Sequence, residues 1–210
     1  MARYAGGRPD RSVARARALR LLGFPAHLPV RVVAVRSPLP LDRVGALVCP
    51  ERLVKAAPLA DVGVLLAATV DCGLFPTGVL AGIGEAVRPA SSWRQARTAL
   101  RFATPGDPVI RYDDLGALAL LAEVPREVAR DNVDVAAIAR LAEGREELAT
   151  LEAYCATGSV RRAAELLHLH HSSVARRLEQ IGRALGVDLT APAGLTRARL
   201  ALTSWRLLTG

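Results

Sequence analysis

Hydroxyl, imidazole and guanidinium side chains are concentrated between residues 158 and 186, in a pattern that favours binding of a ligand over catalysis. On a helix with 3.6 residues per turn, Ser172, Arg176 and Arg183 share one face. The opposite face is apolar and consists of Val174, Leu178, Ile181 and Leu185. Because arginine makes planar, bidentate contacts with phosphate and guanine, the polar face predicts contact with nucleic acid.

A shorter helix is predicted just before this one. Ser159 can cap it, and its apolar residues follow the spacing of a buried stripe: Val160, Ala163, Ala164 and Leu167. His168 to His171 form a polar break, after which Ser172 or Ser173 can cap the second helix. The paired alanines allow two helices to cross closely, so the segment predicts a helix-turn-helix. A purely structural hairpin is the alternative, but it does not explain arginines on the far face.

Ten side chains are predicted to contact DNA: Arg161, Arg162, His170, His171, Ser172, Ser173, Arg176, Arg177, Gln180 and Arg183. Arg176 is the expected base or groove contact and Arg177 a flanking phosphate contact. A solvated face is an equally good interpretation of Arg161 and Arg162. A histidine bound to phosphate would make affinity rise as the pH falls. No metal site is expected, because adjacent histidines in a turn diverge whereas zinc needs four converging ligands.

Composition is consistent with this prediction. The chain has 210 residues, a formal charge of +8 and a single lysine, Lys55. Residues 158 to 206 hold eight arginines and three acidic residues, a local net charge of +5. A GC-rich coding sequence would also favour arginine. Three widely spaced cysteines and no apolar run long enough for a bilayer predict a cytoplasmic protein without membrane contact.

The first half alternates predicted strands and helices, which indicates an α/β domain. The predicted strands are Val30–Val35, Val62–Val70, Val79–Gly84 and Val109–Tyr112, with a short apolar piece at Ala46–Val48. Serine-capped helices are expected from Ser12 and from Ser91 or Ser92, and a helix or loop over Glu51–Leu59. Gly82 and Gly84 fit a strand end better than a phosphate loop, which would need more of its motif. Asp113 or Asp114 is expected to cap a helix over Asp114–Leu121.

The second half is predicted to be helical. A helix over Glu127–Leu141 is interpreted as a linker, and Leu148, Leu151 and Cys155 form the inner stripe of the next helix. A last helix, Leu195–Leu208, offers Leu200, Leu202, Trp205 and Leu208 for packing.

The C-terminal motifs resemble the PucR/CdaR family of bacterial transcription regulators. The resemblance rests on Leu148-Ala-Thr-Leu-Glu-Ala-Tyr154 and on the run from Ala163-Ala164 through His168, His170 and Val174 to Arg177-Leu178 and Ile181. His171, Ser172 and Ser173 stand where the family usually has Arg, Asn and Thr. The resemblance implies a DNA-binding regulator in which these three residues alter the sequence that is read.

The N-terminal half resembles the GGDEF-like domain of the same family. The shared features are Gly82-Ile-Gly84, the helix Ser92–Leu100 and Arg111-Tyr-Asp-Asp-Leu-Gly116. The Gly-Gly-Asp/Glu-Glu-Phe pentapeptide of diguanylate cyclases is absent from the sequence, so the resemblance implies a fold without catalysis or cofactor. Relatives commonly carry a further sensory domain, which is not expected here. A signal would then enter through the α/β domain, a partner or protein abundance.

The expected organisation is therefore α+β. Residues 12–122 form a degenerate GGDEF-like α/β domain, 123–145 a helical linker and 146–210 a helix-turn-helix domain that reads double-stranded DNA. A single small helix-turn-helix domain covers only a short DNA site, so a homodimer is expected. An unknown small-molecule or protein effector is also expected. The alternative is a non-enzymatic ligand-binding or protein-interaction module whose helix-turn-helix serves as a scaffold.

Overall fold

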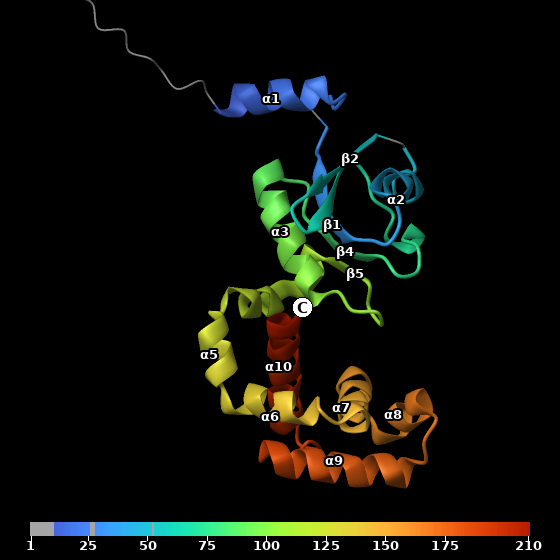
Figure 1. The fold of residues 1–210 in the computed structure, drawn as a ribbon, viewed down its shortest axis with the longest axis vertical. Helices are drawn as coiled ribbons and strands as arrows, with labels where there is room; N and C mark the ends of the chain where they lie inside the picture. Colours follow the sequence, from blue (N-terminus) through green and yellow to red (C-terminus); the bar gives the residue numbers. More distant parts are fainter. Residues whose placement is uncertain (1–10, 26–27, 52) are drawn as a thin grey trace, which may run out of the picture. The chain divides into compact units, whose positions relative to one another are not determined.

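The computed structural model describes residues 11–25, 28–51 and 53–210, and the side chain of Ser12 lies outside its described part. The chain divides into two compact units, one ending at Ala119 and the other running from Leu120 to Gly210. A five-stranded sheet lies in the first unit and the second is helical (Figure 1). The predicted mixed α and β fold is confirmed.

The sheet has the strand order β2-β3-β1-β4-β5. Its strands are β1 (Arg31–Arg36), β2 (Val54–Leu59), β3 (Val62–Ala67), β4 (Leu80–Ile83) and β5 (Val109–Arg111). The pairs β2–β3, β1–β3 and β1–β4 are antiparallel, while β4–β5 is parallel. In register, Val33 of the central strand β1 lies opposite Leu65 and Ile83. The buried, β-branched sequence of β1 explains its central place.

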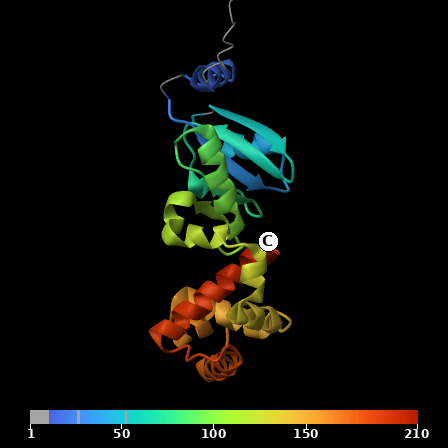
Figure 2. The same ribbon diagram turned by 90° about the vertical axis from the view of Figure 1, so that its left-hand side faces the viewer.

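A helix covers each face of the sheet (Figure 1), and Figure 2 views the sheet from the side of the green helix at residues 89–102. On one face, Val44 and Val48 of α2 (Leu41–Val48) join the core formed by Val33 and Val35. On the other, α3 (Pro89–Phe102) packs Ala96 against Ala34. The first unit also contains α1 (Arg11–Leu21), the 3₁₀ turn η1 (Cys72–Leu74) and α4 (Tyr112–Leu115), and the 3₁₀ helix η2 (Gly116–Glu123) follows.

Gly82 and Gly84 bring α3 unusually close to β4. A Cβ atom at Gly82 would overlap the backbone nitrogen of Leu100 and the carbonyl oxygen of Ala96. One at Gly84 would overlap the carbonyl oxygen of Ser92. The two glycines therefore serve close packing of a helix on a strand, in agreement with the preference for a strand end over a phosphate loop.

Several local predictions for the first unit were wrong. Residues 54–59 form strand β2 instead of a helix or loop, and Ala46–Val48 belongs to α2. Helix α3 begins at Pro89, so Ser92 lies inside it, where its buried hydroxyl accepts a hydrogen bond from Val32 N at 2.9 Å. Helix α4 begins at Tyr112 after Arg111, so the two aspartates lie in its first turn and do not cap it.

The second unit is a bundle of six helices: α5 (Arg126–Asp131), α6 (Val133–Leu141), α7 (Arg145–Thr157), α8 (Val160–Leu167), α9 (His171–Leu185) and α10 (Pro192–Thr209). The segment expected as one linker helix is two, because Asn132 ends α5 and caps α6 by accepting from Asp134 N and Val135 N. Val135, Ala137 and Ile138 of α6 lie in the core of this unit.

Helix α10 is tied to the rest of the bundle by charged contacts. Arg197 donates two hydrogen bonds of 2.7 Å to the Asp134 carboxylate, and Arg206 bonds Glu152 at 2.6 Å. The Arg197 guanidinium holds the pKa of Asp134 below its usual value. Leu202 is buried as predicted, but Leu200 is 40% exposed, because Ala198 and Ala201 occupy the inner face instead.

Candidate nucleic-acid interface

Helices α8 and α9 form the predicted helix-turn-helix, with the turn at His168 to His170. Ser159 caps α8 as expected, its hydroxyl accepting from Arg162 N. The predicted cap of α9 was wrong: its N-cap is His170, whose Nδ1 accepts from Ser172 N at 3.4 Å and lies 2.7 Å from the Ser172 hydroxyl. An aromatic residue at this place is an unusual cap, since Ser, Thr, Asp and Asn are preferred.

The inner face of α9 packs as the sequence predicts. Val174 and Ile181 are fully buried, and Leu178 and Leu185 are 7% and 6% exposed. Ala163 and Ala164 of α8 are buried in the same core, next to Leu151 and Tyr154 of α7. The small alanine side chains thus let the two helices approach, and the packing fixes which side of α9 faces solvent.

The outer face of α9 presents side chains that can donate hydrogen bonds. Ser172, Arg176 and Gln180 are exposed, as is Arg183, whose Nε donates to the carbonyl oxygen of Glu179. Ser173 is half-buried in the first turn. At the entry to the helix, His171 is exposed and its ring centroid lies 4.2 Å from that of His170.

The two arginines of α8 are also exposed. Arg161 lies 3.5 Å from Glu165 in an ion pair between one helical turn and the next, and its side chain is 89% exposed. Such a pair is weak and can be broken by a competing anion. Both arginines therefore remain accessible to a phosphate beside α8.

Arg177 occupies a different environment from its neighbour Arg176. Its guanidinium bonds the Glu146 carboxylate of α7 at 2.5 Å, and its side chain is only 22% exposed. Sequence reasoning missed this pair, because its two partners lie 31 positions apart. The ion pair joins α9 to α7 and leaves Arg177 half-buried, whereas Arg161, Arg162, Arg176 and Arg183 are exposed.

Comparison with known families bears on this half of the chain. Residues 148–204 match the PucR C-terminal helix-turn-helix domain. The match extends from the second turn of α7 almost to the end of α10, so it contains α8, the turn and α9. A PucR-type helix-turn-helix indicates a transcriptional regulator.

No curated protein matches the chain. The crystal structure of a regulator of polyketide synthase expression from Bifidobacterium adolescentis is similar to this chain at 18% identity, over 94% of this chain and 91% of that one, with a TM-score of 0.34.

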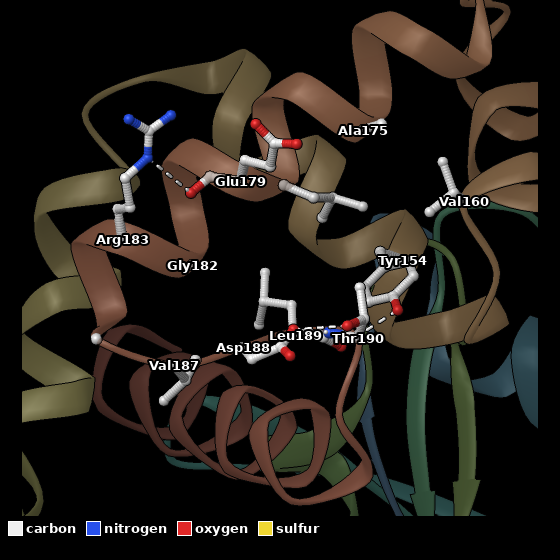
Figure 3. Close-up of a pocket in the computed structure, with 12 residues that line it drawn as sticks. Tyr154, Val160, Ala175, Glu179, Gly182, Arg183, Val187, Asp188, Leu189 and Thr190 are labelled. Carbon is white, nitrogen blue, oxygen red and sulfur yellow. Dashed lines mark hydrogen bonds between the residues drawn. The ribbon is translucent and has the colours of Figure 1, made fainter.

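A cavity of about 580 Å³ lies beside α9 in the PucR-type domain (Figure 3). Its walls are mostly apolar and include Val160, Leu178 and Leu189, while Glu179 and Arg183 lie along one side. Val187, Leu189 and Thr190 of the loop after α9 form part of the wall. A Cβ atom at residue 182 would lie only 2.8 Å from the carbonyl oxygen of Val187, so Gly182 allows this loop to lie close to α9. The cavity reaches from the exposed flank of α9, at Glu179 and Arg183, to its buried face at Leu178 and Gly182.

The His170 cap of the PucR-type domain can be tested by substitution. His170→Ala is expected to lower the free energy of unfolding by about 1 kcal/mol, since it removes the acceptor for Ser172 N. His170→Asn, which restores a good capping residue, should recover most of that loss. Urea unfolding followed by circular dichroism measures both, and equal stability of His170→Ala and the wild-type protein would show that the imidazole does not cap α9.

Within residues 11–25, 28–51 and 53–210, no group of three or more His, Cys, Asp or Glu side chains is arranged to hold a metal ion. No helix in the same ranges is both long and apolar enough to cross a bilayer. Cys49, Cys72 and Cys155 are free thiols.

Proposed function

We propose that the protein is a sequence-specific DNA-binding transcriptional regulator of the PucR/CdaR type that reads DNA with α9. The observation that supports this most is the division of α9 into a fully packed face and an exposed face bearing Ser172, Arg176, Gln180 and Arg183. A recognition helix needs this division, because its inner residues hold it while its outer residues enter the major groove.

The proposal gives different roles to five of the predicted contacts. Arg176 contacts a base, since it is exposed near the N-terminal half of α9, the part that meets base edges in helix-turn-helix proteins. Arg161, Arg162 and His171 contact phosphates at the edges of the groove. His170 contributes chiefly by capping α9, and only its Nε2 is left to meet DNA.

The proposal includes a homodimer acting in the cytoplasm. One recognition helix covers a short site, and two copies on a two-fold site would supply the affinity that one lacks. The sheet unit is proposed to be a GGDEF-like domain that has lost catalysis: its tight β2–β3 hairpin turns at Ala60 and Asp61 and carries no Gly-Gly-Asp/Glu-Glu-Phe sequence. Its role would be dimerisation or reception of an effector.

Sequencing the genomic fragments that the purified full chain retains tests the function directly. Fragments sharing a two-fold motif, and a fall in affinity with salt that reflects several phosphate contacts, are the expected result. Size-exclusion chromatography with light scattering, with and without such a fragment, measures the oligomeric state. Failure to retain any fragment at low salt would favour the alternative, a protein-interaction module with a helix-turn-helix scaffold.

The Glu146–Arg177 pair makes a prediction about affinity. Glu146→Gln should release Arg177 for a phosphate and strengthen DNA binding about two- to fivefold, with the salt dependence steeper by about one counterion. Stability should change by less than about 1 kcal/mol, because Glu146 is largely exposed. Fluorescence anisotropy at several salt concentrations measures the change.

Glu143→Gln is the matched control for Glu146→Gln, since it removes the same charge from an exposed position before α7. Equal affinity of the two variants would mean that only net charge changed. Weaker binding by Glu146→Gln would mean that the ion pair positions α9 for DNA instead of competing with it.

A further inference from the structure

A second, smaller cavity of about 270 Å³ lies in the sheet unit, where β1 begins and β4 and β5 end. Figure 1 shows these three strands as neighbours. Arg31 and Arg111 both line this cavity, and the other lining residues are Pro29, Ala68, Thr69, Val70, Cys72, Ile83 and Ala86. Two of the nine are therefore cationic and none of them is acidic.

The strand register explains why both arginines reach the same space. Side chains alternate along a strand, so Arg31 shares a face with Val33, which packs beneath α2. Arg111 lies opposite Ile83 in the parallel pair, and Ile83 lies opposite Val33. The two arginines thus flank Ile83 on the α2 face of the sheet, from either side of β4.

Three carboxylates within two positions of the lining residues in sequence do not themselves line the cavity. Asp113 lies 3.6 Å from Arg111, with both side chains about two-fifths exposed, which makes a weak ion pair. Glu85 is bonded to Gln95 at 2.7 Å, and Asp71 accepts from Gly73 N. Arg31 has a long contact of 3.4 Å from Nη1 to the carbonyl oxygen of Gly84. The side chains that line the cavity therefore carry two positive charges and no negative charge.

We propose that this cavity binds a small oxyanion, a phosphate or a carboxylate-bearing molecule, between Arg31 and Arg111. Guanidinium groups bond such anions in charge-assisted pairs, and Thr69 can offer its hydroxyl at the rim. The cavity is smaller than the pockets of about 300–1,000 Å³ that hold drug-sized ligands, so the anion is small. It lies beyond the carboxyl ends of the parallel strands β4 and β5. This site is independent of the DNA-binding proposal.

Titration of the full chain in chloride buffer of constant ionic strength tests the proposal. Inorganic phosphate and succinate are added separately, and isothermal calorimetry and the melting temperature are measured. Saturable binding of phosphate alone, or of succinate alone, identifies which oxyanion the site accepts. Saturation by neither would overturn the proposal.

Three variants locate the site. Arg31→Gln and Arg111→Gln should each weaken binding at least about tenfold, as expected for loss of a charge-assisted hydrogen bond. Asp113→Asn should strengthen it up to about fivefold, because it removes the carboxylate that competes for Arg111. Arg94→Gln, an exposed position on α3, should match the wild-type protein.

The opposite directions of these effects keep the test decisive. Asp113→Asn retains both arginines, so it reports on the site even if an arginine variant is poorly folded. Unchanged binding in all three variants, or an equal loss in Arg94→Gln, would show that any binding depends on general surface charge and would rule out the site.

Discussion

Arg176→Ala is expected to weaken binding to a retained operator fragment by about 5- to 150-fold, corresponding to about 1–3 kcal/mol for a bidentate base contact. The reason is geometric: Arg176 is exposed on the side of α9 opposite Val174 and Ile181, which hold the helix in the core. Its loss should also relax discrimination at one base position. Anisotropy titrations with the operator and with single-base variants measure both effects.

Arg140→Ala is a suitable control for Arg176→Ala, because Arg140 is an exposed arginine on α6 of the same unit. Both variants lose one positive charge, so a difference between them reports on position and not on net charge. A loss for Arg176→Ala that is equal on every sequence would make this residue a phosphate anchor. An affinity for DNA equal to that of Arg140→Ala would mean that Arg176 does not contact DNA.

Gly82→Ala is expected to destabilise the sheet unit by about 3 kcal/mol, the upper end of the cost of overpacking. The added methyl group would overlap the backbone of α3 at Ala96 and Leu100, and a backbone cannot move aside as a flexible side chain can. Helix α3 would have to shift away from β4, opening the core at Ala34 and Ala96. Thermal and urea unfolding measure the loss.

Gly106→Ala provides the control for Gly82→Ala, since a Cβ at Gly106 would meet no atom within 4 Å and its φ is not in the left-handed region. Its stability should be within about 0.5 kcal/mol of the wild-type value. If Gly82→Ala were equally benign, α3 would pack on β4 less closely than the structure describes. A loss of DNA binding without a loss of stability would likewise contradict this account.

The helix-turn-helix could be predicted because its determinants are local. Ser159 and the apolar residues of α9 follow the helical period, and a buried stripe at that spacing can be read without knowing what covers it. The strands β1 and β3 were predictable for a similar reason, since they are continuous apolar runs.

Other features depend on contacts that a single segment does not contain. Strand β2 was missed because it is an exposed edge strand containing Lys55 and Pro58, so it lacks the alternation of a half-buried strand. The pairing of Arg177 with Glu146 and the place of Arg31 beside Arg111 arise only when distant segments meet. The His170 cap was missed because imidazole is not a preferred capping group.

In the helix-turn-helix, the residues that position α9 are different from the residues that α9 exposes. His168 ends α8 in a left-handed conformation with φ of 53°, and Leu169 N donates to Ala164 O at 3.0 Å, so the backbone of the turn fixes how α9 is presented. The exposed positions Arg176 and Gln180 take no part in that geometry. Substitutions there should cost little folding free energy, so under the proposed function paralogues could acquire new target sequences while keeping the same scaffold.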